Sequence, residues 1–352
     1  MPTLFDPAKI GDLKIPNRII MAPLTRCRAS AGRVPNALNA EYYAQRASAG
    51  FILSEATSVT PMGVGYPDTP GIWSAEQVEG WKLVTKAVHN AGGRIFLQLW
   101  HVGRVSDPIY LDGKLPVSAS AVAAVGTVSL VRPQRPYVTP RALEIDEIPG
   151  IIEEYRRGAE NALAAGFDGV EIHGANGYLP SQFLSDANNF RTDSYGGSIE
   201  NRARFLLEAT DAAISVWGAS RVGVHISPRG SRSEPGPDSD PTATFGYVAA
   251  ELRNRDIAFL FARESLEGHR FSPEIRKAFG GFYIANEEFT RESGESVLGA
   301  GEADAVGYGI PFIANPDLPR RFAQQAALNE PIAELFYAPG VKGYTDYPTL
   351  AA

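Results

Sequence analysis

Eight short apolar runs recur along the chain, and a segment of helical character separates most of them. The runs lie at 18–23, 50–56, 94–99, 166–172, 221–227, 257–262, 281–286 and 303–309. They are continuous rather than alternating, which is typical of parallel strands in a sheet covered on both faces. Helices are expected at 36–48, 74–89, 149–165, 198–217, 242–254, 272–279, 290–300 and 316–327. Repeated strand–helix units of this number predict an α/β chain folded as a (β/α)8 TIM barrel.

An open, doubly wound sheet is the alternative for this alternation. Such a sheet usually carries a Gly-rich dinucleotide-binding turn after its first strand. Here the first strand runs into Pro23, Leu24 and Thr25 instead. The closed barrel is therefore favoured, and a chain of 352 residues suits a single barrel domain spanning 1–352.

Three stretches lie outside the barrel rhythm. Residues 1–18 combine turn formers with short alternating segments, which predict a hairpin cap. Residues 101–147 are rich in Pro, Ser, Val and Gly. We expect them to form an excursion after strand three, over one end of the barrel and partly hairpin, and excursions of this length are usually functional. Residues 328–352 are rich in Pro and Gly and are expected to wrap the barrel.

Composition argues against several classes of protein. The net charge is −7 and the basic residues are scattered, so neither a nucleic acid nor an anionic membrane surface is an expected partner. No apolar run approaches the ~18 residues of a membrane helix, and the N-terminus lacks a secretory pattern, so we expect a cytoplasmic protein. Cys27 is the only cysteine, which excludes an intrachain disulfide and a Cys-rich zinc site.

Hydrogen-bonding side chains gather where the strands end. Catalytic groups of a barrel come from the C-terminal ends of its strands, and the fourth strand delivers His173, Asn176 and Tyr178 on Gly-rich backbone. Other ends deliver Thr25 and Gln98. The set is poor in paired carboxylates and has no compact metal-binding motif, so glycosidase and metal-hydrolase functions are not favoured and no metal is expected. It suits a planar heteroaromatic cofactor, with a phosphate at strands seven and eight.

Longer motifs surround these residues. They lie at 17–26, 54–57, 65–66, 69–72, 98–104, 173–179, 191–202 and 312–318. Together they resemble the Old Yellow Enzyme family of FMN-dependent ene-reductases along nearly the full chain, and look closest to its bacterial xenobiotic reductase and N-ethylmaleimide reductase branch. The resemblance implies that NADPH or NADH reduces FMN, and that hydride then passes to the β-carbon of a small α,β-unsaturated carbonyl compound. Nitro compounds and nitrate esters are further expected substrates.

The resemblance also implies roles for the substrate-side residues. His173 and Asn176 would donate hydrogen bonds to the carbonyl oxygen of the substrate, where negative charge develops. Tyr178 would protonate the α-carbon, since a phenol suits a much more basic carbanion. Tyr66 and Trp100 would shape the substrate pocket.

A second set of residues would hold the flavin. These are Pro23, Leu24, Thr25, Ala56, Gln98, His225, Asn286, Glu287, Gly309 and Ile310. Three of them depart from the family pattern: His225 and Ile310 stand where many members have Arg, and Glu287 where many have Gly. A protonated His225 would partly replace the missing guanidinium. Glu287 would have to turn its carboxylate away, so that its backbone N–H can bind the phosphate.

The segment 191–202 reads as a structural brace for the loop after the fourth strand. It carries two arginines and two acids that we expect to pair among themselves, namely Arg191, Asp193, Glu200 and Arg202. Such pairing would hold the loop without taking part in chemistry.

Two other functions compete with the ene-reductase. One is a flavin-free barrel enzyme that isomerises or cyclises a carbonyl substrate with the His173, Asn176 and Tyr178 set. The other is a binding or structural protein with a decayed site, which the intact set argues against. For any of the three, a monomer or a small homo-oligomer is expected.

Overall fold

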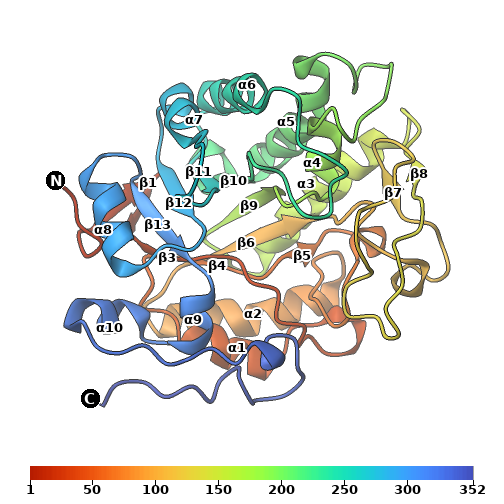
Figure 1. Ribbon diagram of the computed structural model, residues 1–352. Helices are drawn as coiled ribbons and strands as arrows, with labels where there is room; N and C mark the ends of the chain where they lie inside the picture. Colours follow the sequence, from red (N-terminus) through yellow and green to blue (C-terminus); the bar gives the residue numbers. More distant parts are fainter. Residues whose placement is uncertain (352) are drawn as a thin grey trace.

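The computed structural model describes residues 1–351 and shows a closed parallel barrel ringed by helices (Figure 1). Its strands are β3 (Ile19–Met21), β4 (Ile52–Leu53), β6 (Ile95–Trp100), β9 (Gly169–Gly174), β10 (Val222–Ile226), β11 (Phe259–Arg263), β12 (Tyr283–Asn286) and β13 (Ala305–Tyr308). Neighbours pair in parallel, and the β13–β3 and β4–β6 pairings close the ring. A short strand, β5 (Thr57–Ser58), pairs with the end of β6. The predicted barrel is confirmed, and the open sheet is excluded because no edge remains between β3 and β13.

Helices occupy the predicted segments between the strands. They are α1 (Ala37–Ala44), α2 (Ala75–Asn90), α3 (Ile148–Ala164), α5 (Ile199–Trp217), α6 (Pro241–Asn254), α7 (Ser272–Phe279), α8 (Arg291–Gly299) and α10 (Leu318–Gln324). Two further short helices, α4 (Leu179–Leu184) and α9 (Ile310–Ala314), were not expected. The start of α2 has the predicted capping box, in which Ser74 Oγ accepts the Gln77 N–H and Gln77 Oε1 accepts the Ser74 N–H. No helix within 1–351 is both long and apolar enough to cross a membrane.

Aromatic side chains fill the barrel at the N-terminal ends of its strands. The Phe51 ring lies 5.1 Å from that of Phe96 and 5.4 Å from that of Phe259, and all three are fully buried. The hairpin of β1 (Ala8–Ile10) and β2 (Leu13–Ile15) packs its buried isoleucines against this cluster, as the predicted cap requires. Each fully buried side chain of this kind contributes roughly 1.5–3 kcal/mol. This end is therefore sealed, and the polar residues lie at the opposite end.

The excursion at 101–147 was expected to be partly hairpin, and the structure bears this out only at its tip. Its strands β7 (Val117–Ser118) and β8 (Arg141–Ala142) pair in parallel, so the hairpin expectation was wrong for the ladder that anchors it (yellow in Figure 1). Antiparallel pairing in this stretch is limited to one bridge, Thr127 with Pro136. The segment leaves β7 and returns in the same direction, which a long connection permits and a tight turn does not.

The C-terminal tail wraps along the outside of the barrel next to α9 and α1, as expected (Figure 1). Buried arginines hold its backbone: Arg26 Nε donates to the Phe336 carbonyl at 3.0 Å, and Arg28 Nη2 donates to the Leu335 carbonyl at 3.0 Å. Tyr344 of the tail stacks on Tyr42 of α1, with ring centres 4.1 Å apart. The tail thereby becomes part of the wall at the open end of the barrel.

The brace at 191–202 is only partly as predicted. Arg191 and Asp193 form an ion pair at 2.6 Å. Arg202 instead pairs at 2.7 Å with Asp238, which lies in the loop after β10, and Glu200 sits in the first turn of α5 with no ion pair in the described chain. Arg202 pairs with the distant Asp238 rather than with a carboxylate of its own segment, because both side chains are buried and face each other in the folded chain.

Candidate active site

A large cavity opens at the C-terminal ends of the strands. It has an inner lobe of about 660 Å³ and an outer lobe of about 850 Å³, and the two share part of their walls. The predicted residues that line the inner lobe are Pro23, Leu24, Thr25, Tyr66, Asn176, Tyr178, His225, Asn286, Glu287, Gly309 and Ile310. The outer lobe lies under the excursion, against Val125, Thr127, Ser129 and Tyr137. The cavity is therefore where a barrel would hold its active site.

Four predicted residues lie behind this lining rather than on it. Ala56, Gln98, Trp100 and His173 are buried and do not line either lobe. Trp100 is fully buried, and its ring lies 5.2 Å from that of Tyr178, which it supports from behind. These residues can act on the cavity by positioning their neighbours, or through single atoms that reach it.

The loop after β9 presents Asn176 in an unusual backbone conformation. Asn176 and Gly177 both have positive φ, 59° and 74°. A Cβ on residue 177 would lie 2.6 Å from Ser233 Oγ, and the positive φ at this position also favours glycine. The Asn176 N–H donates to Ser227 Oγ at 2.8 Å, and Asn176 Oδ1 accepts from Arg263 Nη1 at 2.8 Å. With Oδ1 engaged, Nδ2 is the amide group left to donate into the cavity.

Two stacked imidazoles lie beside this loop. The rings of His173 and His225 are 5.2 Å apart and nearly parallel. His173 Nδ1 accepts the Ala175 N–H at 3.4 Å, so its ring proton belongs on Nε2. Burial, helped by His225 and Arg263, holds the pKa of His173 well below its usual value. His173 is therefore a neutral Nε2–H donor.

His225 is neutral as well, which corrects the expectation of a cation. The Gln98 Nε2 amide, which can only donate, lies 3.2 Å from His225 Nδ1, so the ring proton is on Nε2. That Nε2 is buried and has no partner among residues 1–351. Burial lowers the pKa of His225 to about 3, and raises the pKa of nearby Glu171 to about 8. Burial thus disfavours the charged forms of both His225 and Glu171, although Glu171 Oε2 lies only 3.7 Å from His225 Nδ1, close enough for an ion pair.

Tyr178 is a protonated phenol at the boundary of the two lobes. Its hydroxyl lies 3.0 Å from the hydroxyl of Tyr66, and its ring meets His173 edge-on at 4.9 Å. Burial raises the pKa of Tyr178 well above its usual value, and the neighbouring Tyr66 raises it further. The hydroxyl keeps its proton until a strongly basic atom accepts it.

The opposite wall of the inner lobe offers backbone donors. Glu287, Glu288, Phe289, Gly309 and Ile310 all line it, and within the described chain none of their N–H groups has an acceptor. Glu287 and Glu288 have positive φ, 111° and 59°. Consecutive free N–H groups of this kind form an anion-binding nest. The Glu287 carboxylate is held by an ion pair with Arg263 at 2.8 Å.

Sequence reasoning missed several residues that line the inner lobe, Arg263, Phe336 and Tyr337 among them. Arg263 is the last residue of β11 and lines the inner lobe. It could have been predicted, because it is a charged residue that directly follows an apolar run in the sequence. Phe336 and Tyr337 reach the inner lobe from the C-terminal tail. Nothing in their local sequence could have placed them there, because the docking depends on arginines some 300 residues earlier.

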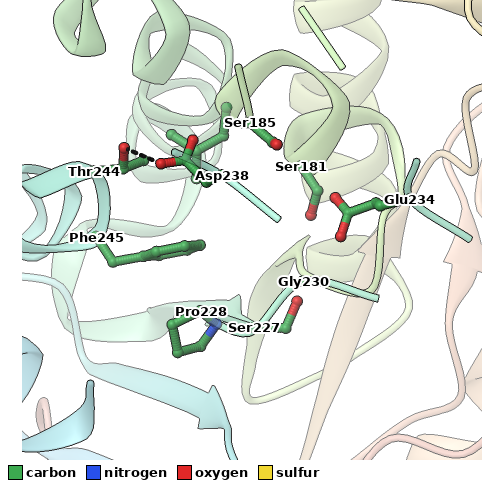
Figure 2. A pocket seen from close by; sticks show the side chains of 10 residues that line it. Ser181, Ser185, Ser227, Pro228, Gly230, Glu234, Asp238, Thr244 and Phe245 are labelled. Atoms are coloured by element: carbon green, nitrogen blue, oxygen red, sulfur yellow. Dashed lines mark hydrogen bonds between the residues drawn. The ribbon is translucent and has the colours of Figure 1, made fainter. Parts of the chain in front are cut away.

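A second, much smaller cavity is lined by Ser181, Ser227 and Asp238, among others (Figure 2). Its volume is about 20 Å³, room for about one water molecule. Asp238 on its wall accepts from Thr244 Oγ1 at 2.9 Å as well as from Arg202. Asp238 thereby links Arg202 and Thr244 in one buried group of hydrogen-bonded side chains. In residues 1–351 no three His, Cys, Asp or Glu side chains are grouped to bind a metal ion.

Comparison with known proteins matches the whole chain. The sequence model of the NADH:flavin oxidoreductase / NADH oxidase family aligns with residues 3–329. The chain belongs to this family. It is 46% identical over 360 residues to 12-oxophytodienoate reductase 1 of Oryza sativa subsp. japonica, covering 99% of this chain and 93% of the relative. The Arabidopsis thaliana 12-oxophytodienoate reductase 2 is 43% identical over 364 residues, with 99% and 96% covered.

Solved structures of the family superpose closely. The old yellow enzyme homologue from Zymomonas mobilis gives a TM-score of 0.96 at 47% identity, covering 99% of this chain and all of the other. Morphinone reductase in complex with tetrahydroNAD gives 0.95 at 49% identity, with 100% and 98% covered. The Old Yellow Enzyme resemblance is confirmed. The protein is an FMN-dependent ene-reductase that uses NAD(P)H as reductant.

The cavity has what the family's cofactor needs. The inner lobe is large enough for FMN, the buried Nε2–H of His225 lacks a partner, and the nest at Glu287 and Gly309 offers free N–H groups. Thr25 and His225 would hold the ring system, and the nest would hold the phosphate. Arg263 is the only Lys or Arg that lines the inner lobe within 1–351. Neutral hydrogen-bond donors would therefore make most of the polar contacts with the cofactor.

Proposed function

We propose that the protein reduces the carbon–carbon double bond of α,β-unsaturated carbonyl compounds with the residues predicted above. The observation that carries this proposal is the grouping of three neutral donors: Asn176 and Tyr178 line the cavity, and the His173 ring lies directly behind them, 4.9 Å from the Tyr178 ring. Bound FMN supplies the hydride that reaches the β-carbon, having taken it from NAD(P)H. The protein must then bind the carbonyl oxygen and deliver one proton to the α-carbon.

Asn176 and His173 bind the carbonyl oxygen in this proposal. Arg263 occupies Asn176 Oδ1, and the Ala175 N–H occupies His173 Nδ1, so each residue has only its donor atom to offer. Both donors are fixed before the substrate arrives, and they stabilise the negative charge that develops on the oxygen. Loss of one such donor typically costs about 10²–10³-fold in rate.

Tyr178 is the proton donor. Its raised pKa keeps the hydroxyl protonated at neutral pH, and a carbanion next to a carbonyl is basic enough to take the proton. Tyr66 lies 3.0 Å from Tyr178 and lines both lobes, so it offers a path for replacing the proton from the outer lobe. Trp100 holds the Tyr178 ring from behind.

The substrate class follows from the cavity and the relatives. The outer lobe leaves room for a bulky group, and relatives are named for 12-oxophytodienoate and morphinone. We propose cyclic and open-chain enones as substrates, with nitro compounds and nitrate esters as further acceptors. Cytoplasmic localisation and a monomeric or small oligomeric state stay predictions.

Absorbance spectroscopy of the purified protein tests the proposal. A flavin spectrum that NADPH bleaches and cyclohexenone restores is expected, with a product carrying two more hydrogen atoms than the enone. A colourless protein that takes up no added FMN would overturn it. Formation of a product with unchanged mass would favour the flavin-free isomerase or cyclase instead.

A further inference from the structure

Arg263 is hydrogen-bonded to the predicted substrate donor Asn176, and this contact has a consequence for the rate of substrate reduction. It is the last residue of β11, lines both lobes of the cavity, and leaves 40% of its side chain exposed. Its two terminal nitrogens have different partners. Nη1 donates to Asn176 Oδ1 at 2.8 Å, and Nη2 donates to Glu287 Oε1 at 2.8 Å.

This arrangement decides which way the Asn176 amide points. An asparagine can present either its oxygen or its NH2 group, and only the NH2 group can bind a carbonyl oxygen. A guanidinium has donors and no acceptor, so Arg263 can only hold the amide oxygen. The Asn176 backbone is fixed separately by Ser227, which leaves the side-chain orientation to Arg263.

Glu287 fixes Arg263 in turn. The planar guanidinium cannot turn without breaking one of its two hydrogen bonds, so the ion pair with Glu287 fixes the nitrogen that faces Asn176. The positive charge also polarises the amide, because hydrogen bonds in a chain strengthen one another. The Nδ2–H of Asn176 becomes a better donor to an oxygen that gains negative charge.

We propose that Arg263 is a positioning residue for substrate reduction, which orients and polarises Asn176 while Glu287 anchors it. This inference rests on the proposed role of Asn176 in binding the carbonyl oxygen. It adds a charged residue from β11 to a set that otherwise comes from β9 and its loop.

Kinetics of Arg263 variants give the first test. Arg263→Met should lower kcat/KM for cyclohexenone by roughly tenfold to a hundredfold, less than or equal to the loss in Asn176→Ala. Arg263→Lys keeps the positive charge but lacks the two terminal nitrogens that donate to Asn176 and Glu287, so it should recover part of the lost kcat/KM. In the double variant the two losses should not add, because Arg263 acts through Asn176. Additive losses would overturn the proposal.

Binding of an oxyanion gives a readout that does not depend on turnover. The probe is 4-nitrophenol, whose pKa when bound to the FMN-loaded protein is followed by difference absorbance. The wild-type site should favour the phenolate, and both Arg263→Met and Asn176→Ala should raise the bound pKa by about one unit. Arg255→Met is the matched control, because Arg255 pairs with Asp211 on the outer helices at 2.7 Å.

The outcomes separate the two proposals. If Asn176→Ala raises the bound pKa and Arg263→Met leaves it at the wild-type value, the Arg263 inference fails and the role of Asn176 stands. If Asn176→Ala has no effect either, the proposed function of Asn176 fails. If Arg263→Met does not fold, Arg263→Lys and Arg263→Gln carry the same comparison, and wild-type values in both would overturn the inference.

Discussion

Glu287 stores backbone strain that glycine would release, and this can be measured. Its φ of 111° lies in a region that favours glycine, and a non-glycine residue there costs about 1–3 kcal/mol. Its ion pair with Arg263 joins side chains that are 26% and 40% exposed, so it contributes about 1 kcal/mol or less. Glycine also destabilises by roughly 0.5–1 kcal/mol relative to alanine at an ordinary position.

These magnitudes predict an inverted order of stability. Glu287→Ala loses the ion pair and keeps the strain, whereas Glu287→Gly loses the ion pair and releases the strain. The glycine variant should therefore be more stable than the alanine variant by about 1 kcal/mol, once its entropic cost is subtracted. Urea unfolding of the flavin-free protein, with an unchanged m value, measures the difference.

Glu330 provides the matched control. It is exposed, has negative φ, and forms no ion pair within the described chain. There the alanine variant should be the more stable, by roughly 0.5–1 kcal/mol. If the glycine variant is the weaker one at both positions by the same margin, Glu287 stores no strain and the reasoning is refuted.

Three further predictions concern the cavity. In stopped-flow measurements, Tyr178→Phe should slow the enone half-reaction by about 10²–10⁴-fold and leave flavin reduction by NADPH largely intact. Tyr66→Phe should slow the enone half-reaction much less. An equal loss of rate in both half-reactions of Tyr178→Phe would contradict the proton-donor role. Burial raises the pKa of Glu171 from 4.5 to about 8, so its contribution to stability is fully present below pH 4.5 and is lost as pH rises through about 8. The free energy of unfolding of the wild type, relative to that of Glu171→Gln, should therefore fall between these two pH values. A difference that does not change with pH in urea unfolding would refute the assignment. Glu288 has no ion pair in residues 1–351, so Glu288→Gln should tighten FMN binding several-fold in a fluorescence titration, and an unchanged Kd would argue against a phosphate at this wall.

The barrel and the core of its site could be predicted because both are local in sequence. Apolar runs and helical segments alternate regularly along the sequence. The strands are uninterrupted apolar runs because the sheet is buried on both faces. His173, Asn176 and Tyr178 stand within six residues, so their grouping needed no tertiary information. The capping box of α2 was equally local.

The tertiary structure decided what depends on distant partners. Arg263 reaches Asn176 across 87 positions in the sequence. Phe336 lines the cavity from the tail, where Arg26 and Arg28 both donate to its carbonyl. The parallel pairing of β7 with β8 depends on the path of the whole excursion.

The protonation states were also beyond local reasoning. A protonated His225 was expected to replace the missing guanidinium in part, and burial instead lowers its pKa to about 3, which favours the neutral ring. Burial is a property of the packed fold, since the same imidazole on an open strand end would titrate near its ordinary pKa. The sequence by itself therefore determined the barrel and indicated which side chains we propose as donors. Only the packed fold decided their charge, their orientation and the arginine that holds one of them in place.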